Sequence, residues 1–416
     1  MTRPGWHRPD PTDAYFAYDM EHVLFGLDLP SLDALRRGVA AMAQVNPGIF
    51  RVTESASGRW RAFSRPELRD APERLVTSSD AIGPEGAMGT VLATTLRGVN
   101  FRLVHGPDWL GLRVSHAALF DGVSTFTMLA GLLSPGVAPQ SVQVVPGPRR
   151  DAMLAGYLAT HPVAVRAAAV HRARLASTRL APAPATPVEP PAFTHVHSSG
   201  QLPRRLRELR DECWPTASVG AVLLVGFRAG LAQAGVTPHA GAEVLMDVRR
   251  YFPSPRPIFG NWAAGVHVRA VDDYSPTSVT RATQAAARAG LPVAAMAAGR
   301  VLGRLRASTT LDRPVPSPMG APRISFTFLG AHSVAARLPW RTDRTAFTVE
   351  RTRPANAEAI TLVAKEIGGR FSFTASHYES VWPAAVVRAA LTRFLDDPLQ
   401  VIRSAADRSA SLPEAS

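Results

Sequence analysis

A proline-rich segment near the middle of the chain, residues 181–192 (APAPATPVEPPA), constrains the fold more than any other stretch. So many prolines favour an extended, semi-rigid spacer. On both sides of it, stretches with strand-like patterns, such as 109–115 and 347–353, alternate with stretches of helical spacing, and no short repeat is present. The chain is therefore expected to be an α/β protein of two parts, residues 1–180 and 193–416, with mixed sheets flanked by helices.

The composition restricts the class of protein. Apolar residues make up 46% of the 416 residues and charged residues 19%, which allows a sizeable core and excludes a wholly disordered chain. A single cysteine, Cys213, excludes a disulfide framework and cysteine-rich zinc or iron–sulfur sites. The net charge is +13, and nearly all basic residues are arginines, with Lys365 as the one lysine. Because the arginines are scattered and do not alternate with aromatic residues, we expect no nucleic-acid partner.

No segment is expected to insert into a membrane. The helix expected at residues 218–234 is nearly all apolar and must be buried, but it contains Arg228 and is shorter than the ~20 residues that a spanning helix needs. Residues 1–19 mix Arg, Pro, His and Asp and lack the apolar stretch of a signal peptide. We therefore expect a cytoplasmic protein.

Residues able to carry chemistry gather at the ends of predicted strands. A hairpin of two strands within residues 100–115 leads into the sequence HAALFDG at 116–122 and then into an apolar helix at 124–133. In the second part, Asp-Val-Arg at 247–249 ends a predicted strand, and Gly-Asn-Trp follows at 260–262.

Taken in this order, these stretches resemble the motifs of the chloramphenicol-acetyltransferase-like superfamily. That group includes nonribosomal-peptide condensation domains, polyketide-associated acyltransferases and wax-ester-type acyltransferases, and its motif H-H-x-x-x-D-G ends a strand as residues 116–122 do. Residues 32–50 are similar to the family's first helix and the strand after it, and residues 325–330, with Leu-Pro-Trp at 338–340, are similar to a late strand and loop. The resemblance covers most of the chain and implies two lobes with a tunnel between them.

The resemblance also implies a reaction and its partners. The expected protein is a stand-alone acyltransferase of bacterial specialised metabolism, such as antibiotic biosynthesis, that forms an amide or ester from a coenzyme A or phosphopantetheine thioester. An acyl- or peptidyl-carrier protein is an expected partner, because arginines suit an acidic protein or the phosphates of coenzyme A. No metal and no permanently bound cofactor is expected.

One position departs from the family's motif. His116 stands at the first histidine position, and Ala117 replaces the second histidine, which in the family takes the proton of the attacking hydroxyl or amine. By the resemblance, Asp121 and Gly122 are structural, and Asp121 pairs with Arg249 and so ties the two lobes together at the tunnel. A one-residue shift of the loop would make His116 the catalytic residue, and otherwise His116 is a buried structural histidine.

The resemblance places four residues along the tunnel. Ala117 and Ser325 are expected to line it, Asn261 is expected as a structural hydrogen-bonding residue beside it, and His332 is a candidate replacement for the missing base.

Other histidines and the cysteine fit ordinary structural roles better. His195 and His197 alternate along a predicted strand and could hold a metal, but no cluster supplies a third ligand nearby. His377 ends a predicted strand and is expected in a solvated loop, with a position facing the tunnel as the alternative. Cys213 lies at a helix end and is expected to fill the core.

Three hypotheses for the function stay open. The first is acyl transfer without the usual base, in which holding both reactants together is worth about 7–11 kcal/mol. The second is a tunnel that catalyses other chemistry, such as cyclisation of a polyketide or peptide intermediate. The third is a non-catalytic protein that binds a carrier protein or stabilises a partner enzyme.

Overall fold

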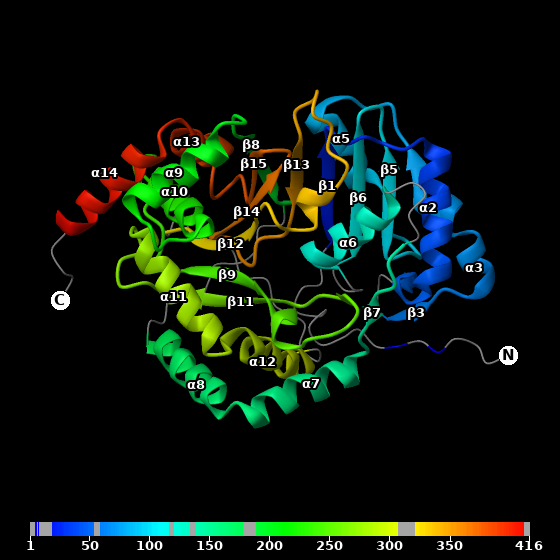
Figure 1. Cartoon of the computed structure of the whole chain (residues 1–416), viewed down its shortest axis with the longest axis horizontal. Coiled ribbons are helices and arrows are strands. Elements are labelled where there is room, and N and C mark those ends of the chain that lie inside the picture. Colours follow the sequence, from blue (N-terminus) through cyan, green and yellow to red (C-terminus); the bar gives the residue numbers. More distant parts are fainter. Residues whose placement is uncertain are drawn as a thin grey trace.

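The computed structural model describes residues 5, 7, 19–53, 59–115, 120–133, 139–177, 189–306 and 321–411. Two large sheets lie side by side, with the blue and cyan strands of the first half of the chain on the right of Figure 1 and the sheet of the second half on the left. Both sheets contain parallel and antiparallel pairs, and helices flank them. The expected α/β fold with mixed sheets flanked by helices is confirmed. Most of the proline-rich spacer, residues 181–188, lies outside the described residues.

The first sheet has the strand order β13-β1-β6-β5-β4. Side chains alternate across it, so that Leu24 of β1 packs under helices α2 and α6, whereas Val23 and Phe25 pack under α5. Its strands are β1 (Asp19–Phe25), β4 (Val76–Ser78), β5 (Phe101–His105), β6 (Trp109–Ser115) and β13 (Phe347–Arg351), and its main helices are α2 (Leu32–Val45), α5 (Gly83–Ala93) and α6 (Gly122–Leu132).

The second sheet has the order β11-β9-β12-β14-β15-β8. Strand β12 runs parallel to both β9 and β14, and the other pairs are antiparallel. The strands are β8 (Ala192–His197), β9 (Ala242–Asp247), β11 (Ala263–Val268), β12 (Arg323–Leu329), β14 (Ala359–Ile367) and β15 (Arg370–His377). Helices α9 (Leu202–Cys213), α10 (Val219–Gln233), α13 (Ala384–Asp396) and α14 (Pro398–Ser411) form its main core, and α11 (Pro276–Arg288) and α12 (Leu291–Arg306) pack near β11.

The remaining elements are short or lie between the halves. They are η1 (Pro47–Ile49), β2 (Arg51–Thr53), β3 (Trp60–Ala62), α3 (Arg65–Arg69), α4 (Ala71–Leu75), β7 (Gln143–Val144), α7 (Gly147–Thr160), α8 (Pro162–Ser177), η3 (Val248–Tyr251), β10 (Ile258–Phe259) and η4 (Ala335–Arg337).

Helix α10 is buried on all sides, as its apolar sequence predicts. Ser218 caps its N-terminus by accepting a hydrogen bond from the Ala221 N–H. Arg228 is buried within it, and its Nη1 donates to the carbonyl oxygens of His239 at 3.0 Å and Gly241 at 2.7 Å, so that backbone oxygens replace part of the water that the charge loses. Within the described ranges, no helix combines the length and the hydropathy that crossing a bilayer requires.

The two halves exchange elements. Strand β13 belongs to the second half of the sequence but pairs antiparallel with β1 and forms one edge of the first sheet. Strand β7 of the first half pairs in parallel with β10 of the second half, and helices α7 and α8 pack against α12. These crossings hold the two halves together along several lines of contact.

The edge of β13 that pairs with no described strand has its partners in the second sheet, where side-chain hydroxyl groups bind its backbone N–H groups. The backbone N–H groups of Thr348 and Glu350 donate to Ser372 Oγ at 3.0 Å and to Thr374 Oγ1 at 3.2 Å. The hydroxyls come from alternate residues of β15, which therefore all point to one face of the second sheet. The edge of one sheet is thus sealed by the face of the other.

The single lysine of the chain lies in the seam between the sheets. Lys365 of β14 is 1% exposed and contacts the carboxylate of Glu350, and its Nζ lies 4.2 Å from the centre of the Phe126 ring. Glu350 also lies 2.8 Å from His22 Nδ1. Burial, and next the charge of Lys365, lower the pKa of His22 to about 3, so this imidazole is neutral at physiological pH.

Candidate active site

The candidate active site begins where β6 leads into α6. Residues 116–119, which include His116 and Ala117, lie outside the described residues. Directly after them, Asp121 caps α6, and its Oδ1 accepts a hydrogen bond from the Ser124 N–H at 2.8 Å. An aspartate at this position satisfies a free N–H group of the first turn and places a negative charge at the positive end of the helix dipole. The start of α6 therefore fixes the direction of the Asp121 carboxylate.

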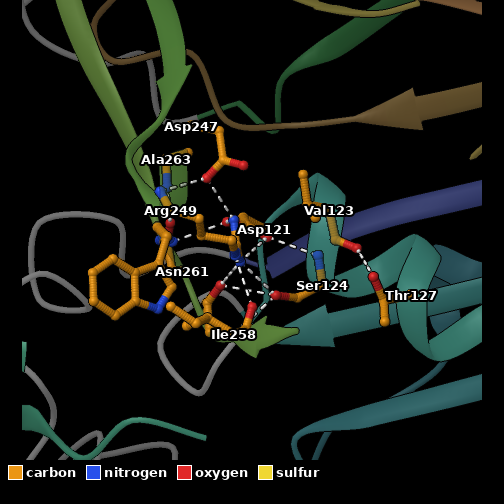
Figure 2. Close-up of polar contacts among 11 residues, drawn as sticks. Asp121, Val123, Ser124, Thr127, Asp247, Arg249, Ile258, Asn261 and Ala263 are labelled. Atoms are coloured by element: carbon orange, nitrogen blue, oxygen red, sulfur yellow. Dashed lines mark hydrogen bonds and ion pairs between the residues drawn. The ribbon is translucent and has the colours of Figure 1, made fainter. Parts of the chain in front are cut away.

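Arg249 reaches this carboxylate from the second half of the chain. Strand β9 ends at Asp247, and the short turn η3 directs the Arg249 side chain towards Asp121, as Figure 2 shows. Arg249 Nη1 lies 2.8 Å from Asp121 Oδ2, and Nη2 lies 3.0 Å from Oδ1. The expected contact between these two residues is present as a two-point ion pair, and it joins the two halves.

Neighbouring groups complete the hydrogen bonding of this pair. The Trp262 N–H donates to Asp121 Oδ2 at 2.9 Å, and Arg249 Nε donates to a carbonyl oxygen of β10 at 2.7 Å. Arg249 Nη2 also donates to Ser124 Oγ at 2.8 Å, and that hydroxyl donates to the Gly260 carbonyl oxygen at 2.9 Å. The network spans α6, η3 and the segment after β10 (Figure 2).

Both members of the pair are charged at neutral pH. Burial would raise the pKa of the Asp121 carboxyl, but the charge and hydrogen bonds of Arg249, with the Ser124 and Trp262 N–H groups, outweigh burial and lower that pKa. Burial would lower the pKa of Arg249, but the carboxylates of Asp121 and Asp247 outweigh burial and raise that pKa. The HAALFDG motif is therefore anchored, through its own Asp121, by a fixed and largely buried ion pair to Arg249.

The other residues expected near the tunnel lie in different surroundings. Asn261 is 1% exposed, and its Oδ1 accepts a hydrogen bond from the Ala263 N–H at 3.3 Å, next to the ion pair. Ser325 lies on β12, and its hydroxyl donates to Glu243 at 2.6 Å. His332 is exposed in the turn before η4.

Gly122 opens α6, where an added Cβ would lie 3.6 Å from a methyl carbon of Leu329. The end of β12 is thus in contact range of the motif. With residues 116–119 outside the described part of the chain, the tunnel between the halves stays a prediction.

A cavity of about 400 Å³ opens beside the ion pair. It lies between α10 and α11 on one side and β9 and β12 on the other, and Asp247 lines it. Asp247 also contacts Arg249, since its Oδ1 accepts from the Arg249 N–H and from Nη1, each at 3.0 Å. The side chain of Asp247 is 42% exposed, so it connects the buried pair with the cavity.

The remaining histidines have structural surroundings. The rings of His195 and His197 stack on Phe347, with centroids 5.1 and 5.2 Å away, and line a cavity of about 610 Å³. In the described ranges, no group of three His, Cys, Asp or Glu side chains could hold a metal ion. The expectation of a solvated loop for His377 is wrong: it is the last residue of β15, fully buried, with Nε2 3.0 Å from Thr194 Oγ1. Cys213 ends α9 and is half-buried.

The sequence argument missed Ser124, Gly260 and the cavity. Ser124 had a local signal, because a serine three residues after a helix-capping aspartate lies in the first turn beside the cap. The Gly260 carbonyl and the cavity had none, since backbone contacts across two halves and the space between packed elements leave no local pattern.

Comparison with known proteins identifies the fold. No family model and no curated protein matches the chain. The first condensation domain of the calcium-dependent antibiotic synthetase matches 99% of this chain and 99% of its own length, with 14% identity and a TM-score of 0.65. The epimerization domain from the third module of tyrocidine synthetase B matches 98% of this chain and 99% of its own, with 13% identity and a TM-score of 0.59. In a nonribosomal peptide synthetase, FmoA3, the match covers 96% of this chain but 43% of the synthetase chain, with 16% identity and a TM-score of 0.63. The chain therefore shares the fold of these condensation and epimerization domains.

Proposed function

We propose that this protein is a condensation-domain-like acyltransferase that forms an amide or ester from a thioester. The ion pair between Asp121 and Arg249 carries this proposal, because it fixes the end of the HAALFDG motif against the second half of the chain. A loop held in this way can keep two reactants in register between the halves. The shared fold supports the same class of reaction.

The reaction needs few groups from the protein. The acceptor nitrogen or oxygen attacks the thioester carbonyl, a C–N or C–O bond forms, the C–S bond breaks, and the thiolate takes up the proton that the acceptor loses. Positioning of both reactants is worth about 7–11 kcal/mol, whereas a base contributes roughly 10²–10⁴ in rate. With Ala117 at the second histidine position, an amine is the preferred acceptor, since a neutral amine attacks without prior loss of a proton.

The donor is a thioester of coenzyme A or of phosphopantetheine on a carrier protein. Both donors carry phosphate groups, and the chain has a net charge of +13. Exposed arginines bind phosphate and carboxylate groups through two-point hydrogen bonds. An acidic acyl- or peptidyl-carrier protein is the proposed partner.

Intact-mass spectrometry tests the proposal. The protein is mixed with acyl-coenzyme A or acyl-carrier thioesters and with amine or alcohol acceptors, and a product heavier than the acceptor by the acyl group is expected. His116→Ala should lower kcat by roughly 10²–10⁴ without lowering the melting temperature if His116 acts as the base. His332→Ala tests the other candidate base, and because His332 is exposed in a turn, this variant should keep full activity if His116 is the base. Loss of activity in His332→Ala but not in His116→Ala would identify His332 as the base.

A second candidate is isomerising chemistry such as cyclisation of a polyketide or peptide. The match to an epimerization domain favours it, because that domain has the same fold and its name states a different reaction. A product of the same mass as its precursor would support this candidate and reject acyl transfer. Binding of a carrier protein without turnover of any substrate would reject both and favour a scaffold.

A further inference from the structure

The cavity beside the ion pair has mainly apolar walls. Strand β9 contributes Val244 and Met246, strand β12 contributes Phe326 and Phe328, and α10 contributes Leu224. These three elements all belong to the second half of the chain and lie near one another on the left of Figure 1. Small-molecule sites usually enclose about 300–1,000 Å³, and this cavity of about 400 Å³ lies near the lower end of that range. It therefore suits one compact apolar group.

Three charged side chains line the same cavity at one edge. They are Asp247, Arg250 and Arg288, and all three are exposed. The hydroxyl of Tyr251 donates to the Ala287 carbonyl oxygen at 2.6 Å. This hydrogen bond ties the segment that carries Asp247 and Arg250 to the end of α11 that carries Arg288, so the charges gather where these two elements meet.

These charges keep hydrogen-bonding capacity for a ligand. Both contacts of Asp247 with Arg249 use Oδ1, and in the described part of the chain Oδ2 accepts no hydrogen bond. The guanidinium of Arg250 lies 5.5 Å from the centre of the Tyr251 ring, and Arg288 Nη1 lies 3.5 Å from an amide oxygen of Gln284. Among the described residues, neither arginine pairs with a carboxylate. The edge of the cavity thus offers one carboxylate oxygen and two cationic groups.

We propose that this cavity binds a free α-amino acid with an apolar side chain, as the acceptor of the acyl transfer proposed above. The side chain enters between the walls formed by Phe326 and Phe328. The carboxylate of the amino acid binds Arg250 and Arg288, and its ammonium group donates to Asp247 Oδ2. An apolar acid would leave Asp247 Oδ2 without a donor, and an apolar amine would leave Arg250 and Arg288 without a carboxylate to bind.

The chemical step balances with this ligand. The bound ammonium first releases one proton to solvent, and the resulting amine attacks the thioester carbonyl. A C–N bond forms, the C–S bond breaks, and the thiolate takes up the second proton that leaves the nitrogen. Only this role as acceptor rests on the proposed function, whereas binding of the amino acid does not.

Calorimetric titration of the full chain with four ligands tests the binding site. L-Phenylalanine is compared with phenethylamine, which lacks the carboxylate, with 3-phenylpropionate, which lacks the ammonium group, and with L-serine, which lacks the apolar side chain. Each loss is expected to weaken binding at least tenfold, because a hydrogen bond to a charged group and the burial of an apolar side chain each contribute enough for that factor. Equal affinity for L-phenylalanine and its analogues would overturn the proposal.

Substitution of Gly220 locates the site. An added Cβ at this α10 position would lie 3.3 Å from the Phe328 ring, so Gly220→Leu places a side chain in the cavity and should abolish binding of L-phenylalanine. Gly89→Leu is the matched control, because Gly89 lies on helix α5 with no heavy atom within 4 Å of an added Cβ. Wild-type affinity in a folded Gly220→Leu protein, checked by its melting temperature, would overturn the proposal.

Substitution of Arg288 tests the carboxylate contact. Arg288→Gln should weaken L-phenylalanine at least tenfold and leave phenethylamine unchanged. Arg281→Gln, on the same helix but outside the cavity wall, should change neither. Equal weakening of both ligands by Arg288→Gln would count against the assigned contact.

Binding and turnover separate this inference from the proposed function. Binding of L-phenylalanine without acylation of any amine would support the site and reject acyl transfer. Acylation of amines by a protein that binds no apolar amino acid would reject the site and support acyl transfer.

Discussion

Asp121 caps a helix and pairs with an arginine at the same time. Its two oxygens accept from the Ser124 and Trp262 N–H groups and from both terminal nitrogens of Arg249. A desolvated pair of this kind adds little net stability compared with well-packed apolar residues, because both charges lose their hydration. The ion pair instead has a positioning role, because it fixes the start of α6 relative to the second half of the chain.

Removal of one partner should be costly. We expect Asp121→Asn to lower the free energy of unfolding by about 3–5 kcal/mol, because the buried Arg249 guanidinium loses its two-point partner and keeps only the more exposed Asp247 carboxylate as counter-charge. Urea denaturation measures this change. The matched control is Glu208→Gln, which removes an exposed pair with Arg204 on α9 and should leave the urea midpoint unchanged. An Asp121→Asn protein with wild-type stability would show that the pair does not hold the two halves.

His195 should make stability depend on pH. Burial, followed by the charges of His197 and Arg388, lowers the pKa of this imidazole to about 3. The folded state therefore favours the neutral ring, and this stabilisation is complete above the unfolded pKa of about 6.5 and is lost as pH falls from there towards 3. Urea midpoints at pH 7 and pH 5 should differ less in His195→Gln than in the wild type. The same difference in both proteins would contradict the lowered pKa.

At the scale of elements, glycines let α10 and α13 approach closely. A Cβ at Gly226 would lie 2.0 Å from a ring carbon of Phe394, and a Cβ at Gly230 would lie 2.3 Å from the carbonyl oxygen of Ala390. The obstacle at Gly226 is a side-chain ring, whereas the obstacle at Gly230 is a carbonyl oxygen of the α13 backbone. The approach of these two helices therefore depends on Gly230 more than on Gly226.

Gly230→Ala should destabilise the protein although alanine favours helices. The intrinsic preference would stabilise a helix by up to about 1 kcal/mol, but overpacking against α13 costs about 1–3 kcal/mol. Gly156→Ala on α7 is the control, because an added Cβ there meets no heavy atom within 4 Å, and it should raise the melting temperature. A rise in both variants would mean that α13 moves aside freely.

Local patterns in the sequence predict elements better than they predict neighbours. Alternation identified β6 and the strand at 347–353, and an apolar run identified α10 as buried. That β13 would join the first sheet could not be predicted, because its contact between His22 and Glu350 spans 328 positions. His377 was misplaced for the same reason, since its burial depends on packing against Thr194 of a distant strand.

The candidate site was predictable in part. The pairing of Asp121 with Arg249 followed from the resemblance of two short motifs, and neither motif predicts the other from its own residues. The apolar cavity beside Asp247 arises where two helices leave space above two strands, and such space depends on packing rather than on any run of residues.

At the scale of the whole molecule, one seam unites the two sheets. The edge of β13 would otherwise present unpaired N–H groups, but Ser372 and Thr374 of β15 accept hydrogen bonds from it, and Ser376 accepts one from the residue directly after β13. Lys365 and Glu350 form their ion pair in the same seam. Polar groups in a buried interface require a defined alignment of the two sheets, because each one left without its partner is costly.

The seam should weaken when one hydroxyl is replaced by a methyl group. Thr374→Val keeps the shape of the side chain but leaves the Glu350 N–H without its acceptor, and we expect the free energy of unfolding to fall by about 1–3 kcal/mol. Thr125→Val on α6 is the matched control, because among the described residues the buried Thr125 hydroxyl has no hydrogen-bond partner. It should leave stability unchanged or raise it, since burial of an unpaired hydroxyl is unfavourable. Urea denaturation measures the free energy of unfolding of both variants. An equal decrease in both would mean that the β15 hydroxyls do not stabilise the contact between the sheets. A decrease confined to Thr374→Val would mean that these hydroxyls join the two halves.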